Sequence, residues 1–122
     1  MIESLIYLKE IKDVLNHFAK YKSPGPNGWT VEFYLHFFDL MGLDILAAVE
    51  ESRASGSVSG GLNTTFIALI AKSEKPLSFA DYIMISLCNL LYKVITKIIA
   101  NRLKPVLSKC LSMNQFGFLE NR

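Results

Sequence analysis

Basic residues are the ones whose types and spacing in this sequence could do chemistry. Residues 82–119 hold five Lys or Arg and no Asp or Glu, whereas residues 1–81 hold seven basic and ten acidic residues, a net charge of −3. A one-sided basic segment attracts phosphate groups or anionic lipid. A solvated helix face with scattered lysines is the alternative, and five charges alone leave both interpretations open. The five residues are Lys93, Lys97, Arg102, Lys104 and Lys109.

The sequence contains no residue pattern typical of metal-dependent or nucleophilic catalysis. His17 and His36 are far in sequence from any cysteine, so a zinc site is not expected. No Walker-type glycine-rich loop and no Ser/His/Asp pattern is present. We therefore expect no catalytic residue, metal ion or cofactor in this chain. The aspartates are scattered, with no pair at the spacing of metal ligands; they are Asp13, Asp39, Asp44 and Asp81.

Length and composition predict one small domain with its own core. The chain has 122 residues, of which 51% are hydrophobic and 20% charged, a composition that is not typical of disorder. It lacks a run of about 18 consecutive apolar residues, so we expect no membrane association. An acidic N-terminus argues against a secretory signal. Two cysteines form no disulfide framework, so we expect an intracellular protein, nuclear or cytoplasmic and not secreted.

The elements that must position the basic residues begin with an N-terminal helix. Its apolar residues recur at three- and four-residue steps, which predicts an amphipathic helix of about five turns. Pro24 disfavours helical backbone at Ser23 and should stop the helix there. The residues of this apolar stripe are Ile2, Leu5, Ile6, Ile11, Val14, Leu15 and Phe18.

Two further helices are expected after the proline-glycine loop. Thr30 is a plausible N-cap for a helix over 31–41, and Gly42 fits the end of that helix. The next helix should run from about residue 44 to residue 54, with Gly56 ending it. A loop over 55–63 follows.

A β-hairpin and a long basic helix complete the expected elements. Residues 64–71 are β-branched and apolar, and a short strand over 83–86 would pair with them. The last helix should span 87–107, with Pro105 marking a kink or an early end. Its buried stripe would consist of Leu87, Leu90, Leu91, Val94, Ile95, Ile98 and Leu103.

Four blocks of the sequence, in one order and at natural spacing, carry a resemblance to a known family. They read KSPGPNGWTVEFY, GLNTTFIALIAK, ISLCNLLYKVITKIIANRLKPVL and NQFGFLENR. Together they resemble the N-terminal part of the reverse transcriptase domain of non-LTR (LINE-type) retrotransposons, especially plant ones. The resemblance covers nearly the whole chain, and four blocks in register are far more specific than any one of them.

The resemblance implies an α+β fold, predominantly α-helical, that forms the fingers of a right-hand polymerase and lacks the palm catalytic core and the thumb. The chain would be a single partial domain over 1–122. Its parts would be the N-terminal helix (1–22), the proline-glycine loop with two helices (23–63), the β-hairpin (64–86), the basic helix (87–107) and the tail (108–122).

The resemblance also implies roles for basic residues. Lys72 matches a lysine that grips the incoming nucleotide triphosphate, although a solvated strand-end lysine is the alternative. Lys22 lies in a loop thought to run beside the template, although that loop could instead only set the angle between two helices. The residues implied in nucleic-acid binding, through backbone phosphates and therefore weakly and without sequence preference, are Lys22, Lys93, Lys97, Arg102, Lys104 and Arg122.

Several positions depart from the family pattern. Asn27 stands where the family usually has Asp, and Ala71 replaces a usual proline. Ile83 and Met84 replace an Arg-Pro pair, so the bidentate phosphate ligand is absent. Asn121 replaces a usual glycine. A decaying element copy would show this pattern of changes.

The aspartates that hold Mg²⁺ in the complete family enzyme lie in the palm, outside the matched region. We therefore expect a fragment of an RNA-directed DNA polymerase that contributes template and nucleotide contacts, depends on the missing palm as its partner, and is inactive alone. One alternative is a small helical interaction module that binds RNA or a protein. The other is a non-functional retroelement relic.

Overall fold

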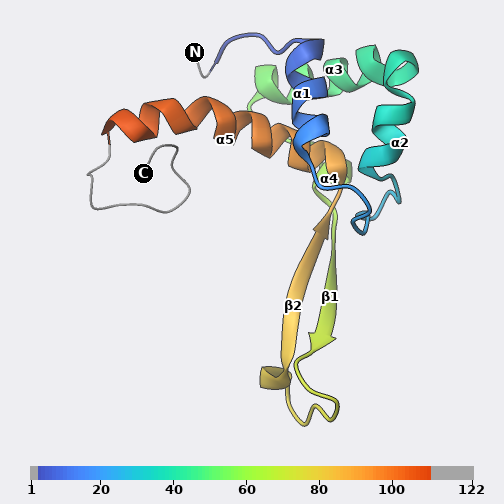
Figure 1. Cartoon of the computed structure of the whole chain (residues 1–122). Coiled ribbons are helices and arrows are strands. Elements are labelled where there is room, and N and C mark those ends of the chain that lie inside the picture. Colours follow the sequence, from blue (N-terminus) through green and yellow to red (C-terminus); the bar gives the residue numbers. More distant parts are fainter. Residues whose placement is uncertain (1–2, 111–122) are drawn as a thin grey trace.

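The computed structural model describes residues 3–110. Figure 1 shows the helices gathered in one body, from which an antiparallel hairpin projects. We call residues 65–88 the hairpin arm and the helices the helical body. The elements of the described residues are α1 (Leu8–His17), α2 (Val31–His36), α3 (Phe38–Ser55), α4 (Gly60–Asn63), β1 (Thr65–Ala71), the short 3-10 helix η1 (Phe79–Asp81), β2 (Tyr82–Cys88) and α5 (Leu90–Cys110).

Helix α1 is shorter than its apolar pattern predicts. It begins at Leu8, whereas the predicted helix begins near residue 2. It ends at His17, before the predicted stop at Ser23. The segment before α1 is held by other helices instead. The Ile6 N–H donates a 2.5 Å hydrogen bond to Glu50 Oε1, on α3. In a helix that began near residue 2, the Ile6 N–H would instead bond to the carbonyl oxygen four residues earlier.

The break between α2 and α3 lies at Phe37, so the prediction that Gly42 ends a helix is wrong. Gly42 is buried inside α3, where a Cβ would lie 3.4 Å from the side chains of Leu8 and Phe38. A side chain at this position would therefore be in ordinary van der Waals contact with α1 and with the preceding turn of α3. The two other predictions of helix ends are confirmed. Thr30 caps α2, since its Oγ1 accepts a hydrogen bond from the Phe33 N–H at 3.3 Å, and Gly56 ends α3 with φ of 70°.

The core lies where α1, α2, α3 and α5 meet. Its most buried side chains are each no more than 1% exposed, and burial of one such side chain contributes roughly 1.5–3 kcal/mol. Among the described residues, the buried core cluster takes no member from the hairpin arm. The most buried members are Ile11, Leu15, Tyr34, Val49 and Val94.

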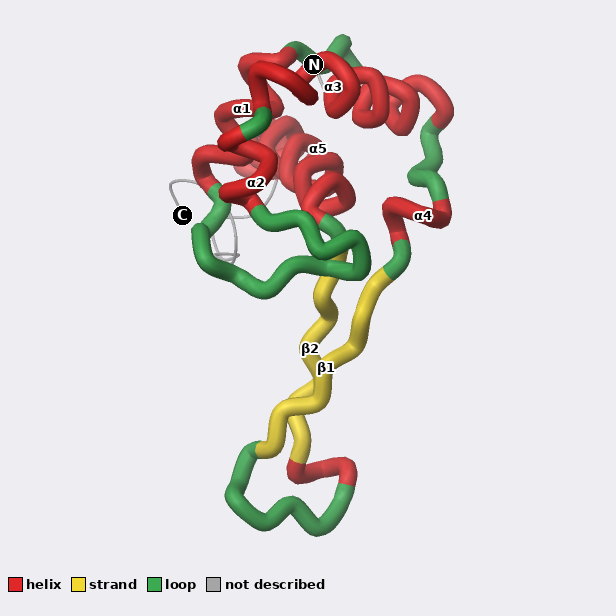
Figure 2. Tube along the Cα trace, turned by 90° about the vertical axis from the view of Figure 1, so that its right-hand side faces the viewer, coloured by secondary structure: helices red, strands yellow, loops and turns green. Residues whose placement is uncertain are grey.

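The predicted hairpin is confirmed, with a longer second strand. β1 and β2 pair antiparallel from Thr65 opposite Cys88 to Ala71 opposite Tyr82. Leu87 therefore belongs to a strand, and its predicted place in the helix stripe is wrong. At the tip, the Lys72 N–H donates to the Asp81 carbonyl oxygen at 2.7 Å. Figure 2 shows the same arm turned by 90°, again clear of the helices.

Helix α5 is a single helix from Leu90 to Cys110 that contains Pro105 in its interior. The expected early end at Pro105 is therefore wrong, although proline removes one backbone hydrogen bond. The predicted stripe is otherwise confirmed at Leu90, Val94 and the pair Ile95 and Ile98, which are buried. Within residues 3–110, no helix combines the length and apolar character needed to cross a membrane.

Candidate nucleic-acid interface

The proline-glycine loop packs directly on the junction between β2 and α5. Gly25 is buried, and a Cβ built on it would lie 2.4–2.5 Å from backbone atoms of Cys88 and Asn89. Real Cβ atoms do not approach backbone so closely, so only glycine fits here without a shift of the chain. The loop is thereby fixed against the start of the basic helix.

Asn89 joins three segments at this junction. It is 2% exposed and immediately precedes α5. Its Oδ1 accepts from the Asn27 N–H at 2.9 Å, and its Nδ2 donates to the carbonyl oxygens of Gly61 at 3.2 Å and Leu62 at 3.4 Å. A buried amide with these partners satisfies both its acceptor and its donor group. Asn89 thus ties the loop and α4 to the beginning of α5.

This packing brings Lys22 and Lys93 to one pocket, although they lie far apart in the sequence. The pocket has a volume of about 200 Å³ and also has Phe18 and Trp29 among its lining residues. Lys22 is exposed and Lys93 is half-buried. Neither forms an ion pair with another described residue. Two unpaired cations at one pocket favour binding of an anion.

Lys97 and Lys104 continue this surface along α5. At about 100° per helical residue, Lys93, Lys97 and Lys104 fall within an arc of about 40°. The row is roughly 16 Å long, given a rise of about 1.5 Å per residue. Both lysines are half-buried, as expected for long side chains whose stems pack on the helix while their charges face water. We call Lys22, Lys93, Lys97 and Lys104 the lysine surface.

Arg102 lies apart from the lysine surface and is engaged within the chain. Its guanidinium forms an ion pair with Glu10, with Nη2 2.7 Å from Oε2 and Nε 2.9 Å from Oε1. Nη1 donates to the Ser4 carbonyl oxygen at 2.6 Å and Nη2 to the Leu5 carbonyl oxygen at 3.1 Å. Only 13% of the side chain is exposed. Arg102 therefore fixes the N-terminal segment to α5, and its predicted phosphate contact gains no support from this geometry.

Lys72 occupies the far end of the hairpin arm from the lysine surface. It directly follows β1, is exposed, and is joined at the tip to Asp81 by its backbone N–H. Ile83, which stands at the usual arginine position, pairs with Ile70 across the strands. The nucleotide contact of Lys72 stays a prediction. Arg122 lies outside the described residues.

Acidic residues near the basic segments have structural roles. The Tyr21 N–H donates to Glu32 Oε1, and this bond is the main cause that lowers the pKa of the Glu32 carboxyl. Tyr21 has a left-handed backbone with φ of 59°, so Glu32 stabilises the unusual turn just before Lys22. Among residues 3–110, no group of three or more His, Cys, Asp or Glu is placed to hold a metal ion.

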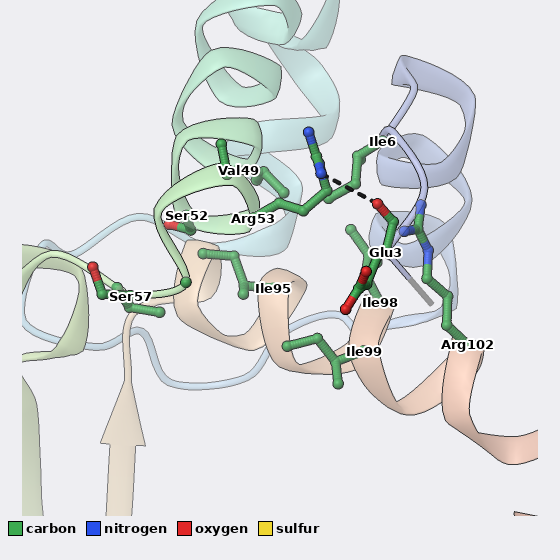
Figure 3. A pocket seen from close by; sticks show the side chains of 13 residues that line it. Glu3, Ile6, Val49, Ser52, Arg53, Ser57, Ile95, Ile98, Ile99 and Arg102 are labelled. Atoms are coloured by element: carbon green, nitrogen blue, oxygen red, sulfur yellow. Dashed lines mark hydrogen bonds between the residues drawn. The ribbon is translucent and has the colours of Figure 1, made fainter. Parts of the chain in front are cut away.

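A larger pocket of about 500 Å³ lies between α3, α5 and the N-terminal segment. Figure 3 shows apolar side chains such as Val49, Ile95 and Ile98 in it, with Arg53 and Arg102 at its edge. Arg53 forms an ion pair with Glu50 at 2.9 Å, and Arg102 is paired as described. Because both cations already have carboxylate partners, this pocket is a weaker candidate for an anion than the lysine surface.

Sequence reasoning had identified the lysines but missed the residues that bring them together. Gly25 lay within the quoted loop without a stated packing role, and Asn89 and Glu32 were assigned no long-range contact. One signal for Asn89 was available. Asparagine directly before an apolar helical stripe is a common cap position, so a polar partner could have been expected there.

Comparison with known proteins finds one informative similarity. No protein-family model matches the sequence. The chain is 29% identical over 114 residues to the Transposon TX1 uncharacterized 149 kDa protein of Xenopus laevis, an alignment that covers 93% of this chain. It spans only 9% of the length of that relative. The similarity is to a transposon protein and is consistent with the LINE-type retrotransposon resemblance; the reverse transcriptase assignment and the plant-like character stay predictions.

Proposed function

We propose that this chain is a nucleic-acid-binding part of a LINE-type retrotransposon protein, equivalent to the fingers of an RNA-directed DNA polymerase. The similarity to a transposon protein supports its origin. The observation that carries the binding function is the convergence of Lys22 with Lys93 at one pocket, in line with Lys97 and Lys104.

The lysine surface would bind the sugar-phosphate backbone of a template strand. Each ammonium group that neutralises a phosphate releases a condensed counterion, so affinity falls as salt rises. Contacts of this kind carry little sequence information. The surface therefore suits a segment that holds a template of any sequence in place, and it does not suit a segment that recognises particular bases.

A salt-dependent titration of labelled single-stranded RNA tests this proposal. Two to four phosphate contacts imply a log–log slope of roughly −1.4 to −2.8, at about −0.7 per contact. The double variant Lys93→Gln/Lys97→Gln should reduce the magnitude of the slope by about 1.4. Homopolymers of different bases should bind the unmodified chain equally well.

The matched control removes the same charge elsewhere. Lys75, at the hairpin tip, and Lys109, on α5, are exposed, and Lys109 lies about 160° around the helix from Lys93. Lys75→Gln/Lys109→Gln should leave the slope within about 0.3 of the parent value. Equal losses in the two double variants would mean that net charge alone attracts RNA, and the proposed surface would be wrong.

Catalysis would belong to a palm supplied from outside the matched region. The resemblance assigns the Mg²⁺-binding aspartates to that palm, and Lys72 would approach the nucleotide bound there. We therefore expect no primer extension by this chain alone with Mg²⁺ or Mn²⁺. Extension above background that a metal chelator abolishes would contradict this part of the proposal.

A second candidate function is a protein-interaction module. The observation that favours it is the hairpin arm, whose large apolar side chains are exposed although the helical body has a closed core. RNA binding with a flat salt dependence, together with tight association through the arm, would favour this alternative.

A further inference from the structure

The pocket shared by Lys22 and Lys93 has aromatic walls as well as two cations. Phe18, which caps the end of α1, and Trp29, which lies just before α2, both line it. Neither lysine forms an ion pair with another described residue. Aromatic rings combined with cations suit a ligand that is planar in one part and anionic in another. A nucleotide within a single strand has both parts, a flat base and the phosphates beside it.

Trp29 is held firmly in the fold and is still partly open. The ring of Phe33 stacks on it, with centroids 5.4 Å apart and an interplanar angle of 23°, and Tyr34 meets it edge-on at 5.8 Å. Its backbone N–H donates to Asn27 Oδ1 at 3.0 Å. With these contacts made, 44% of Trp29 remains exposed. An aromatic side chain already fixed by its neighbours loses little freedom when a ligand packs on it.

The size and the lining of the pocket fit one base. Its volume is about 200 Å³, and a cavity of about 150 Å³ in another protein is large enough to bind benzene. Apolar residues, among them Val31 and Leu90, form part of the wall. None of the described residues that line the pocket is acidic, so a phosphate attached to the bound base would meet no carboxylate on this wall.

We propose that this pocket takes up one unstacked base of the bound single strand, with Trp29 against the base and Lys22 and Lys93 at the neighbouring phosphates. The inference rests on the proposed function, because it adds a base contact to the phosphate contacts of the lysine surface. Lys97 and Lys104 follow Lys93 along α5, so the strand would continue from the pocket along that row. Every base has a flat face, so the contact does not select a sequence.

Two single-stranded RNA octamers with the same number of phosphates test the proposal. One is oligouridine, and the other carries an abasic site at every position. Stacking of a base on an aromatic side chain changes affinity by about 5- to 150-fold, so the unmodified chain should bind the uridine octamer at least about 5-fold more tightly. Both octamers should show the same salt slope, because their phosphates are the same.

Variants of Trp29 place the base at this pocket. Trp29→Ala should remove most of the preference for the uridine octamer and leave the affinity for the abasic octamer unchanged. Trp29→Phe keeps a flat ring and should keep most of the preference. Phe79→Ala is the matched control, because Phe79 is an aromatic residue that is 89% exposed at the hairpin tip, away from the pocket. It should bind both octamers as the parent does.

The fluorescence of Trp29 gives a second measurement that needs no variant. Trp29 is the single tryptophan of the chain, so its emission reports on the pocket directly. The uridine octamer should quench this emission, and the abasic octamer should not. Uridine monophosphate at the same nucleotide concentration should quench far less, because it lacks the phosphates that Lys97 and Lys104 would hold. Equal quenching by the monophosphate would assign the pocket to free nucleotides and overturn the proposal.

The remaining outcomes separate this inference from the proposed function. Equal affinity of the parent for the two octamers, with the expected salt slope, would overturn the base pocket and leave phosphate binding intact. Binding of neither octamer would overturn both. A preference that survives Trp29→Ala, or that Phe79→Ala loses to the same extent, would show that the base lies elsewhere. If Trp29→Ala also loses the abasic octamer through unfolding, the preference of the parent and its quenching still decide.

Discussion

The backbone N–H of Asn27 donates a 2.9 Å hydrogen bond to the side-chain oxygen of Asn89, across 62 residues of sequence. This bond, together with the close packing of Gly25, places the proline-glycine loop on the start of α5. Gly25 of the loop therefore serves a tertiary contact, and Lys22 and Lys93 line one pocket beside it.

Replacing Asn89 by alanine should destabilise the fold clearly. The change leaves the Asn27 N–H and the carbonyl oxygens of Gly61 and Leu62 without this partner, which costs about 1–3 kcal/mol. The melting temperature should fall by roughly 5–15 °C for a domain of this size. Asn63→Ala, at an exposed position, is the control and should stay within about 0.5 kcal/mol in urea unfolding. Equal effects would contradict the role of Asn89.

Gly25→Ala should be among the most destabilising glycine substitutions in the described chain. Its added Cβ meets backbone 2.4–2.5 Å away, which a side-chain rotation cannot relieve. Overpacking of this kind costs roughly 1–3 kcal/mol. The comparison is Gly60→Ala, where nothing lies within 4 Å. Thermal melts of both variants measure the difference, and a Gly25→Ala protein as stable as Gly60→Ala would show that the loop does not pack as described.

Removing the charge of Arg102 should lower stability without changing RNA binding, whereas removing the charge of Lys104 should weaken RNA binding with little effect on stability. Arg102→Gln breaks the ion pair with Glu10 and its bonds to the N-terminal segment, so stability should fall by roughly 1–2 kcal/mol. Its RNA salt slope should not change. Lys104→Gln should reduce the slope by about 0.7 with little loss of stability. A reduced magnitude of the RNA salt slope in Arg102→Gln would mean that Arg102 does contact phosphate.

Acid should weaken the attachment of the N-terminal segment to α3. The Arg53 guanidinium, and after it the Ile6 N–H, lowers the pKa of Glu50 below its ordinary value of 4.5. Because the folded pKa is lower than the unfolded one, the stabilisation is complete above about pH 4.5 and is lost as pH falls through the lower value. The stability difference between the parent and Glu50→Gln should therefore shrink below about pH 4.5.

Urea unfolding at a series of pH values measures this difference. Glu51→Gln provides the control, because Glu51 is the adjacent residue and is exposed. A parent-minus-variant difference that stays constant from about pH 7 to about pH 3 would mean that Glu50 contributes nothing through its charge.

Local signals in the sequence predicted local structure well. Thr30 and Gly56 act through hydrogen bonds and backbone angles within a few residues, so their cap roles could be read directly. The β-branched and apolar run over 64–71 likewise predicted the hairpin. Gly42 was misread because a glycine at a helix end and a glycine inside a helix look the same in one sequence.

Long-range pairing could not be predicted in this way. Arg102 follows Lys93 and Lys97 in the sequence and looks like part of one basic run, yet its partner Glu10 is 92 residues away. Helical geometry alone separates them, since Arg102 lies about 140° around the helix from Lys97. Asn89 carries no charge, and its position before an apolar stripe indicates only a local cap, whereas its three partners come from two other segments.

The hairpin arm also works as a lever. Each seven-residue strand spans about 20 Å, and among residues 3–110 the arm meets the helical body at its base, beside Asn89. A rotation of about 10° at that base would carry Lys72 through roughly 3–4 Å, a distance comparable with a hydrogen bond. The small contacts of Gly25 and Asn89 therefore set where the distant tip points, and a substitution at the base would misdirect Lys72 without touching it.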